Sequence, residues 1–342
     1  MQTTRAWETL TQFRLAAYRA LGHRKDSLFE LMEAVLAAPG PATLVRLSLA
    51  AVFRRAWPSA SDALSDGGVD AAACRRLVRS TQIEPAPERP VWALDGTVWP
   101  RPAAKTSPER TYGHRTTAGI PQDGVVPAWE YEWLVAVPAP GTGWILPLDV
   151  ERRGPSAGAP TAVAIGMLRG ALARRPEDAP RPVGALDSGY DPVQVARADL
   201  PIDVLVRLRS NRAFYRAPGP YQGRGAPRKY GDVFRLADPV THGAPDASRT
   251  LADPQCGRVR IDAWCGLRAR GAADAPFTVV RVELERLPRR TKPPAPLWLA
   301  WIGSDLPTEL ADLWRDYILR FTVETCQAHY PHKRLVSEVC AA

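Results

Sequence analysis

The sequence predicts an α/β protein: a mixed sheet with flanking helices, preceded by an α-helical N-terminal unit. Three observations support this fold class. Apolar residues recur at helical spacing through the first 80 residues. Short apolar strands then alternate with helical segments from 91 to about 208. Further strand-like runs follow, and the chain returns to helix near Thr308.

The N-terminal unit, residues 1–83, contains several short helices. Its first apolar series breaks at Gly22-His23, and a second ends at the breaker Pro39-Gly40-Pro41. The helical positions in the two series are Trp7, Leu10, Phe13, Ala17 and Leu21, then Leu28, Leu31, Val35 and Leu36. A linker rich in proline and glutamate follows from Glu84 to Pro90.

Residues 84–208 alternate between strand and helix. A hairpin, a helix and two further strands follow the first short strand, so the predicted sheet has mixed strand directions. The predicted elements are strands at Val91–Asp95, Trp129–Val137, Trp144–Val150, Pro182–Asp187 and Asp203–Leu208, with helices at Thr161–Arg175 and Pro192–Ala198.

Residues 209–305 begin with a segment, Arg209–Tyr230, that shows little sign of regular structure. Strand-like runs follow at Val259–Trp264, Phe277–Leu284 and Leu297–Ile302. The last helix, from about Thr308, has one apolar side formed by Leu310, Leu313, Trp314, Tyr317, Ile318 and Phe321.

Composition narrows the functional classes. The 342 residues carry a formal net charge of +9, and only five of the 45 basic residues are lysines. A GC-rich coding sequence accounts for much of the arginine, but guanidinium groups pair well with phosphate oxygens in either case. No apolar run is long enough to span a bilayer, and five cysteines without a Cys-x-x-Cys pair disfavour a disulfide scaffold. We therefore expect a cytoplasmic, nucleoid-associated protein with no membrane partner.

Two strands each deliver an aspartate to a glycine-containing turn, at Asp95-Gly96 and at Asp187-Ser188-Gly189. Ligand chemistry collects at the carboxyl ends of strands in α/β sheets, although Asp and Gly also favour turns for conformational reasons alone. On spacing alone the two interpretations are about equally probable. Asp191 before Pro192 predicts a helix N-cap.

A third acid belongs to the pattern Tyr317-x2-Arg320-x3-Glu324. The three residues fall at i, i+3 and i+7, so they lie along one helix face. Without other context, a surface ion pair is the favoured explanation of this pattern.

Together these motifs resemble the DDE transposases of bacterial insertion sequences, in the group with a Tyr-x2-Arg-x3-Glu-x6-Lys signature. Asp95 stands at the first catalytic acid, and Asp187-Ser188-Gly189-Tyr190 is similar to the Asp-x-Gly-Tyr/Phe motif around the second. Tyr317, Arg320 and Glu324 match the first three signature positions, with Glu324 as the third acid. Two segments, 105–114 and 119–126, resemble those of actinobacterial members.

The resemblance implies a ribonuclease H-like catalytic core, a β-rich insertion at 209–305, and a glutamate-bearing helix of the core at 306–330. It also implies two-metal-ion cleavage of phosphodiester bonds. Asp95 would bridge two Mg²⁺ (or Mn²⁺) ions, and Asp187 and Glu324 would each bind one. The freed 3′-hydroxyl would then attack target DNA. We expect transposon-end and target DNA as partners, and a homo-oligomer when the protein is bound to DNA.

The segment from 209 to 230 has no Asp or Glu but several basic and aromatic residues. Phosphate pairing and base stacking favour a DNA-contacting loop, and a solvated loop of GC-biased composition is the alternative. The predicted DNA-binding residues are Arg209, Arg212, Arg216, Arg224, Arg228 and Lys229, with Tyr317 and Arg320 from the signature.

The match fails after Glu324. The signature expects Lys at 331, where this chain has Pro331, and Lys333 is out of register. We therefore expect a truncated copy with an aberrant tail at 331–342, whose loosened site could be inactive. Cys326, His329, His332 and Cys340 offer zinc-type ligands at spacings that fit no familiar finger. The alternatives are a non-catalytic DNA-binding remnant and, less favoured, a hydrolase with paired carboxylates.

Overall fold

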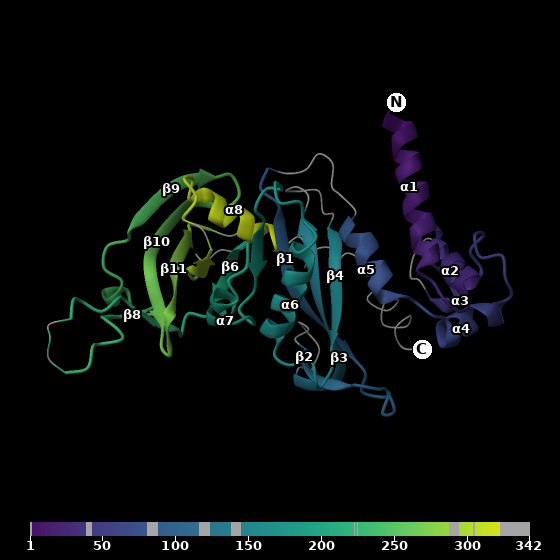
Figure 1. The fold of residues 1–342 in the computed structure, drawn as a ribbon, viewed down its shortest axis with the longest axis horizontal. Helices are drawn as coiled ribbons and strands as arrows, with labels where there is room; N and C mark the ends of the chain where they lie inside the picture. Colours follow the sequence, from purple (N-terminus) through teal and green to yellow (C-terminus); the bar gives the residue numbers. More distant parts are fainter. Residues whose placement is uncertain are drawn as a thin grey trace.

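The computed structural model describes residues 2–38, 43–80, 88–115, 124–137, 145–221, 223, 225–286, 294–303 and 305–321. One large mixed sheet runs through the molecule, with the helical unit at one end and long antiparallel strands at the other (Figure 1). Helices cover both faces of the sheet, so the predicted class, a mixed sheet with flanking helices, is confirmed.

The centre of the sheet is a five-strand arrangement with the order β4-β3-β1-β5-β6. Strand β1 pairs antiparallel with β3 and parallel with β5, and β5 pairs parallel with β6. The short apolar strands β5 and β6 are buried on both faces, as parallel strands usually are. The bounds are β1 Val91–Pro100, β2 Thr111–Arg115, β3 Gly124–Val137, β4 Leu146–Arg153, β5 Val183–Leu186 and β6 Asp203–Leu208.

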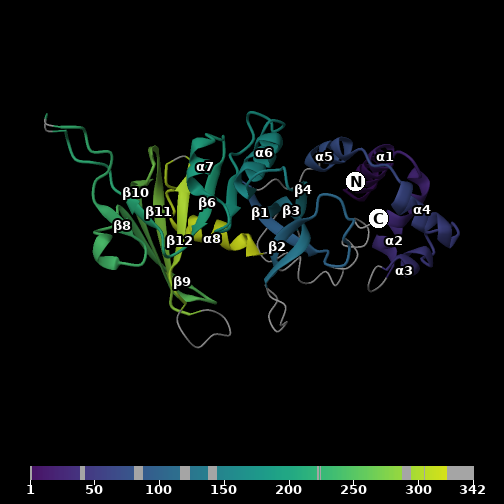
Figure 2. The same cartoon turned by 90° about the horizontal axis from the view of Figure 1, so that it is seen from below.

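Three helices enclose this centre. Figure 2 shows α6 (Pro160–Leu172) and α7 (Pro192–Arg197) on one face and α8 (Ala311–Leu319) on the other. Alternate strand residues pack toward each side: Leu94 and Leu186 share a buried cluster with Leu168 of α6, whereas Ala185 and Leu205 pack with Tyr317 of α8. Strand residues at odd positions in β5 and β6 therefore face α8.

Strand β6 continues the sheet into the long antiparallel strands through β12. The order beyond β6 is β12-β11-β10, with β9 and β7 both pairing with β10 and β8 pairing with β7. The bounds are β7 Ala213–Tyr215, β8 Val233–Arg235, the 3₁₀ helix η1 Pro239–Thr241, β9 Ala247–Asp253, β10 Gly257–Ala269, β11 Ala272–Leu284 and β12 Leu297–Ile302.

The helical unit packs around its own small apolar cluster, which contains Leu31, Leu47 and Phe53. Helix α1 extends away from this cluster, and its Trp7 side chain is 68% exposed. The bounds are α1 Gln2–Arg19, α2 Lys25–Ala37, α3 Leu44–Ser48, α4 Trp57–Asp66 and α5 Ala71–Ser80.

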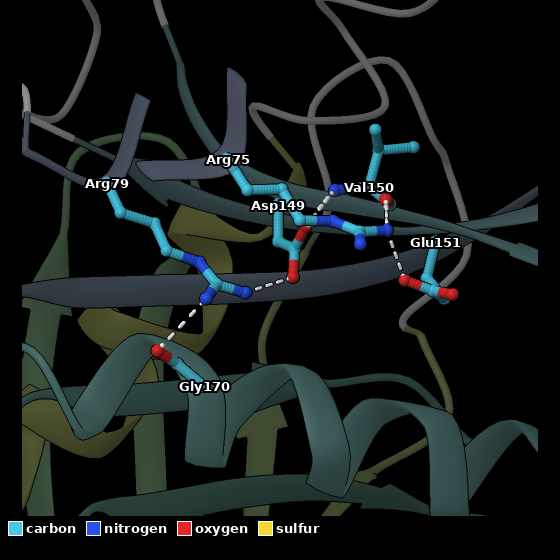
Figure 3. A network of polar contacts seen from close by, with 6 residues as sticks. All are labelled: Arg75, Arg79, Asp149, Val150, Glu151 and Gly170. Carbon is cyan, nitrogen blue, oxygen red and sulfur yellow. Dashed lines mark hydrogen bonds and ion pairs between the residues drawn. The ribbon is translucent and has the colours of Figure 1, made fainter. Parts of the chain in front are cut away.

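Helix α5 joins the helical unit to the sheet through a buried carboxylate, Asp149 of β4 (Figure 3). Arg75 Nε lies 2.8 Å from Asp149 Oδ1, and Arg79 pairs with the other oxygen while donating to the Gly170 carbonyl oxygen at 3.1 Å. Arg75 also pairs with Glu151. Because the Asp149 side chain is only 3% exposed, two guanidinium groups are needed to compensate its desolvation.

No helix within the described ranges is both long enough and apolar enough to cross a membrane.

Replacing Arg79 tests this contact. Arg79→Ala leaves Asp149 buried with only one of its two guanidinium partners, so we expect the free energy of unfolding to fall by about 2–3 kcal/mol. Urea unfolding at pH 7 measures the change. The control is Arg76→Ala on the exposed side of the same helix, which should change the value by less than about 0.5 kcal/mol. Equal losses in the two variants would contradict a special role for Arg79.

Candidate active site

Asp95 and Asp187 lie side by side at the point where the parallel pairing of β1 and β5 ends. The last pair in register is Leu94 with Leu186, and Asp95 and Asp187 are the next residues along the chain. Neighbouring strands are about 4.8 Å apart, so the two acids start from adjacent backbone positions. Because side chains alternate along a strand, Asp95 faces the side of the sheet covered by α8, and Arg320 lies beside it there. Asp187 follows the end of β5, and its charge acts on Tyr317 of α8.

The prediction that the first strand ends on Asp95 is wrong. Strand β1 continues to Pro100, because its antiparallel partner β3 pairs with it as far as Ala128. Only the parallel partner ends here, since β5 stops at Leu186. Asp95 is therefore held by a continuous strand on one side and is open toward the turn after β5 on the other.

The turn after β5 is held by its own side chains. Asp187 Oδ1 accepts a hydrogen bond from the Gly189 N–H at 2.8 Å. Asp191 caps α7 by accepting from the Val193 N–H at 2.9 Å, with Pro192 in the first turn, so the predicted N-cap is confirmed. The strand end and the helix start thus fix the position of Asp187 between them.

Helix α8 places Arg320 against Asp95. The Arg320 Nη1 atom lies 3.4 Å from Asp95 Oδ1, and the Arg320 side chain is 4% exposed. Tyr317, one turn earlier, is fully buried among residues of β5 and β6. Burial raises the pKa of the Tyr317 phenol, nearby Arg320 and Arg207 act to lower it, and Asp187 acts to raise it. Tyr317 and Arg320 therefore line the same face as the two aspartates.

Glu324, the predicted third acid, lies outside the described residues, as do the zinc-type cluster of the tail and the residues at 331–342. In the part of the chain that the structure describes, no group of three His, Cys, Asp or Glu side chains is placed to hold a metal ion. The described portion of the predicted triad is the Asp95–Asp187 pair.

The chemistry of this pair suits a hard divalent cation. Two carboxylates on adjacent strands offer oxygen ligands from one side, which is the kind of partial ligand set that Mg²⁺ accepts alongside water and phosphate. Their charge is opposed by Arg320 from the helix side. Asp95 and Asp187 would thus hold such an ion.

The structure also reveals a carboxylate that the sequence analysis missed. Glu132 of β3 is 3% exposed and pairs in register with Gly96, the residue after Asp95. Its Oε2 atom accepts a 2.6 Å hydrogen bond from the Tyr190 hydroxyl, and Arg153 Nε lies 3.4 Å from Oε1. The sequence did not single it out, because Glu130 and Glu132 both interrupt the apolar run of β3 on the face that carries Leu134.

Glu132 connects strand β1, which carries Asp95, with the turn that carries Asp187. Tyr190 ends the turn that begins with Asp187. Its ring is buried on the α6 face of the sheet, and its hydrogen bond to Glu132 anchors the turn to β3. Burial raises the pKa of Glu132, and the charges of Glu130 and Asp187 act in the same direction, whereas Tyr190 and Arg153 oppose the shift. The Tyr190 pKa is also raised well above its ordinary value, mainly by burial and by Glu132.

The basic segment after β6 lies away from the aspartates. Its central part connects β7 to β8, which lie on the far side of β10 in the sheet order, and Figure 1 shows this connection projecting from the end of the molecule. The side chains of Arg209, Arg212, Arg228 and Lys229 are exposed, and Arg224 is outside the described residues.

Several residues of this segment serve packing. Arg216 is half-buried, donates to the His242 carbonyl oxygen and lies over the Phe234 ring. Phe214 is buried, and Tyr230 packs on Tyr215 and accepts from the Gly271 N–H at 2.6 Å. Among the segment's aromatic residues, Tyr221 is the exposed one, at 57%.

Comparison with known proteins gives the family. A family model described as DDE superfamily endonuclease matches residues 17–268, which is more than half of the chain. The chain belongs to this family. Its function is therefore of the nuclease and transposase type, and its mixed sheet is the ribonuclease H-like fold of such enzymes. The matched span includes Asp95 and Asp187 and ends before α8. No curated protein matches the chain.

Replacing Glu132 tests its raised pKa. The folded state holds the Glu132 proton more tightly than the unfolded chain, so this group's contribution to stability is lost as pH rises through the folded pKa. We expect wild-type stability to fall relative to Glu132→Gln as pH rises from about 4, near the ordinary glutamate pKa. Denaturant midpoints between pH 4 and pH 8 measure this difference.

The control for this series is Glu177→Gln, in an exposed segment between α6 and β5. Because Glu177 is exposed, its variant should differ from wild type by less than about 0.5 kcal/mol throughout the series. A Glu132→Gln difference that does not change with pH would contradict the shift.

Proposed function

We propose that this endonuclease is a DNA transposase that cuts and joins DNA strands with an Asp95, Asp187 and Glu324 triad. The observation that supports the proposal is the register of β1 and β5, in which Asp95 and Asp187 each follow a residue of the last pair, Leu94 and Leu186. Helix α8 covers the sheet face on which Asp95 lies and ends at Leu319, five positions before Glu324 in the sequence. Under this proposal, Glu324 would join the two aspartates in one site.

Two divalent ions, Mg²⁺ or Mn²⁺, would activate water and stabilise the leaving oxygen when bound. Asp95 would be shared by the two ions, and Asp187 and Glu324 would each hold one of them through carboxylate oxygens. The water oxygen attacks phosphorus, and the bond between phosphorus and the 3′ oxygen breaks. The 3′ oxygen leaves as a 3′-hydroxyl, and the phosphate stays on the 5′ end of the other fragment. In the joining step, this 3′-hydroxyl attacks a phosphate of target DNA. A new P–O bond forms to the transposon 3′ oxygen, the P–O3′ bond of the target strand breaks, and the target 3′ oxygen leaves as a hydroxyl.

The chain's own residues prepare the site for an anionic substrate. Arg320 supplies positive charge beside Asp95, which limits repulsion between carboxylates and DNA phosphate. The hydrogen bond between Tyr190 and Glu132 holds the turn that carries Asp187 against β3. The exposed basic residues between β6 and β8 supply a second, more distant DNA contact, and assembly on two DNA ends would form a homo-oligomer.

A cleavage assay tests the proposal. Full-length protein is incubated with supercoiled plasmid in Mg²⁺ or Mn²⁺, and nicked product is measured. We expect metal-dependent cleavage that falls at least about 10³-fold in Asp95→Asn, Asp187→Asn and Glu324→Gln, because each removes a metal ligand. Asp178→Asn, in an exposed segment away from the site, is the matched control and should cleave like the wild type.

The alternatives give different results in the same assay. Binding of plasmid without cleavage in either metal would identify a non-catalytic DNA-binding remnant. Hydrolytic activity toward another substrate that needs no added metal would favour the paired-carboxylate hydrolase.

Salt dependence of DNA binding tests the basic segment. Replacing Arg228 and Lys229 by glutamine should reduce the slope of log affinity against log salt by about 0.9 for each lost phosphate contact, and adding Arg224→Gln should reduce it again. Fluorescence anisotropy with a labelled 30-bp duplex between 50 and 200 mM salt measures the slope. The double variant Arg169→Gln, Arg174→Gln removes two exposed charges near α6 and should leave it unchanged. Equal slopes in all variants would remove the segment from the interface.

A further inference from the structure

We infer that Arg207 of β6 binds the DNA backbone phosphate next to the one that is cut, and so extends the site along the sheet. The inference rests on the proposed function, because it takes Asp95 and Asp187 to mark the position of cleavage. Arg207 lies outside both the acid motifs and the basic segment 209–230, so the sequence analysis did not select it.

The strand register places Arg207 in one row with the two aspartates. Leu94 of β1 pairs with Leu186 of β5, and Leu186 pairs with Val206 of β6. The next residue on each strand is Asp95, Asp187 and Arg207, respectively. Arg207 therefore begins one strand spacing, about 4.8 Å, from Asp187.

Side-chain alternation places Arg207 on the same face as the acids. Leu205, two residues earlier, packs with Tyr317 on the α8 side, and Leu299, the partner of Arg207 in β12, belongs to the same buried cluster. Within β6, Arg207 is the one exposed side chain, since the other five are buried. The exposed guanidinium of Arg207, at the level of the acids, is therefore available to bind an anion.

The surroundings of Tyr317 agree with this placement. The charges of Arg320, Arg207 and Asp187 all act on its buried phenol, so the two arginines lie around the same side chain as Asp187. Arg320 lies beside Asp95, at one end of the row, and Arg207 lies at the other end, next to Asp187. A phosphate over the acids would thus lie between two guanidinium groups.

The row also gives the DNA strand a direction. On the other side of Asp95, the residue in register on β3 is Trp133, which is half-buried against the cluster that contains Ala93 and offers no charge to a phosphate. The basic end of the row is at β6. A strand whose cut phosphate lies over Asp95 and Asp187 would therefore place its next phosphate toward Arg207, where a guanidinium can pair with two phosphate oxygens.

DNA binding by variants is the first test. A labelled 30-bp duplex is titrated with wild type, Arg207→Ala, Arg207→Lys and the control Arg169→Ala, in Ca²⁺ at several salt concentrations. We expect about tenfold weaker binding and a salt slope smaller by about 0.9 for Arg207→Ala. Arg207→Lys should recover part of the loss, and Arg169→Ala should match the wild type. Wild-type binding by an Arg207→Ala protein with an unchanged unfolding midpoint would overturn the inference.

Neutral phosphate substitution is the second test. The cut position is mapped with wild type in Mn²⁺, and single methylphosphonates are then placed at each linkage around it. Neutralising the adjacent phosphate should weaken wild-type binding about tenfold and leave Arg207→Ala binding unchanged, because the partner is already lost. An equal loss in both proteins would overturn the inference. If wild type cuts no DNA, the proposed function fails, and the binding titration still decides whether Arg207 contacts DNA.

Discussion

The parallel register of β1, β5 and β6 is the constraint on which the rest of the site depends. Leu94, Leu186 and Val206 occupy one level of the sheet, so the residues that follow them, Asp95, Asp187 and Arg207, share the next level and the same face. A slip of one residue in any strand would turn its functional side chain to the opposite face. Buried apolar neighbours on both sides of these strands make that slip costly.

The surrounding elements act on this row from two directions. Helix α8 brings Tyr317 and Arg320 over the acids, whereas Glu132 and Tyr190 hold the Asp187 turn from the other face. Neighbouring carboxylates repel one another unless their charges are compensated. Arg320 compensates Asp95 on the α8 face, and Arg153 and the Tyr190 hydroxyl stabilise Glu132 on the α6 face. The span matched by the DDE superfamily endonuclease model includes both aspartates and Glu132.

The same sheet also connects the acids to the basic segment. Strand β12 pairs with β6 and joins the long strands β10 and β11 to the core, and the central part of the basic segment connects β7 and β8 at the end of this strand order. At the opposite end, the buried Asp149 ties α5 to β4 through Arg75 and Arg79. The helical unit and the basic segment are thus held at opposite ends of one continuous framework (Figure 1).

The sequence by itself determined the fold class, the strand that contains Asp95, the strand that Asp187 follows and the N-cap at Asp191, because local apolar patterns and turn residues encode these features. It could not show that β1 continues past Asp95, since that extension depends on pairing with β3. Nor could it select Glu132, Arg153 or Arg207 or distinguish Arg216 from the exposed arginines. Their environments arise from strand register and packing between distant segments, which only the tertiary structure decides.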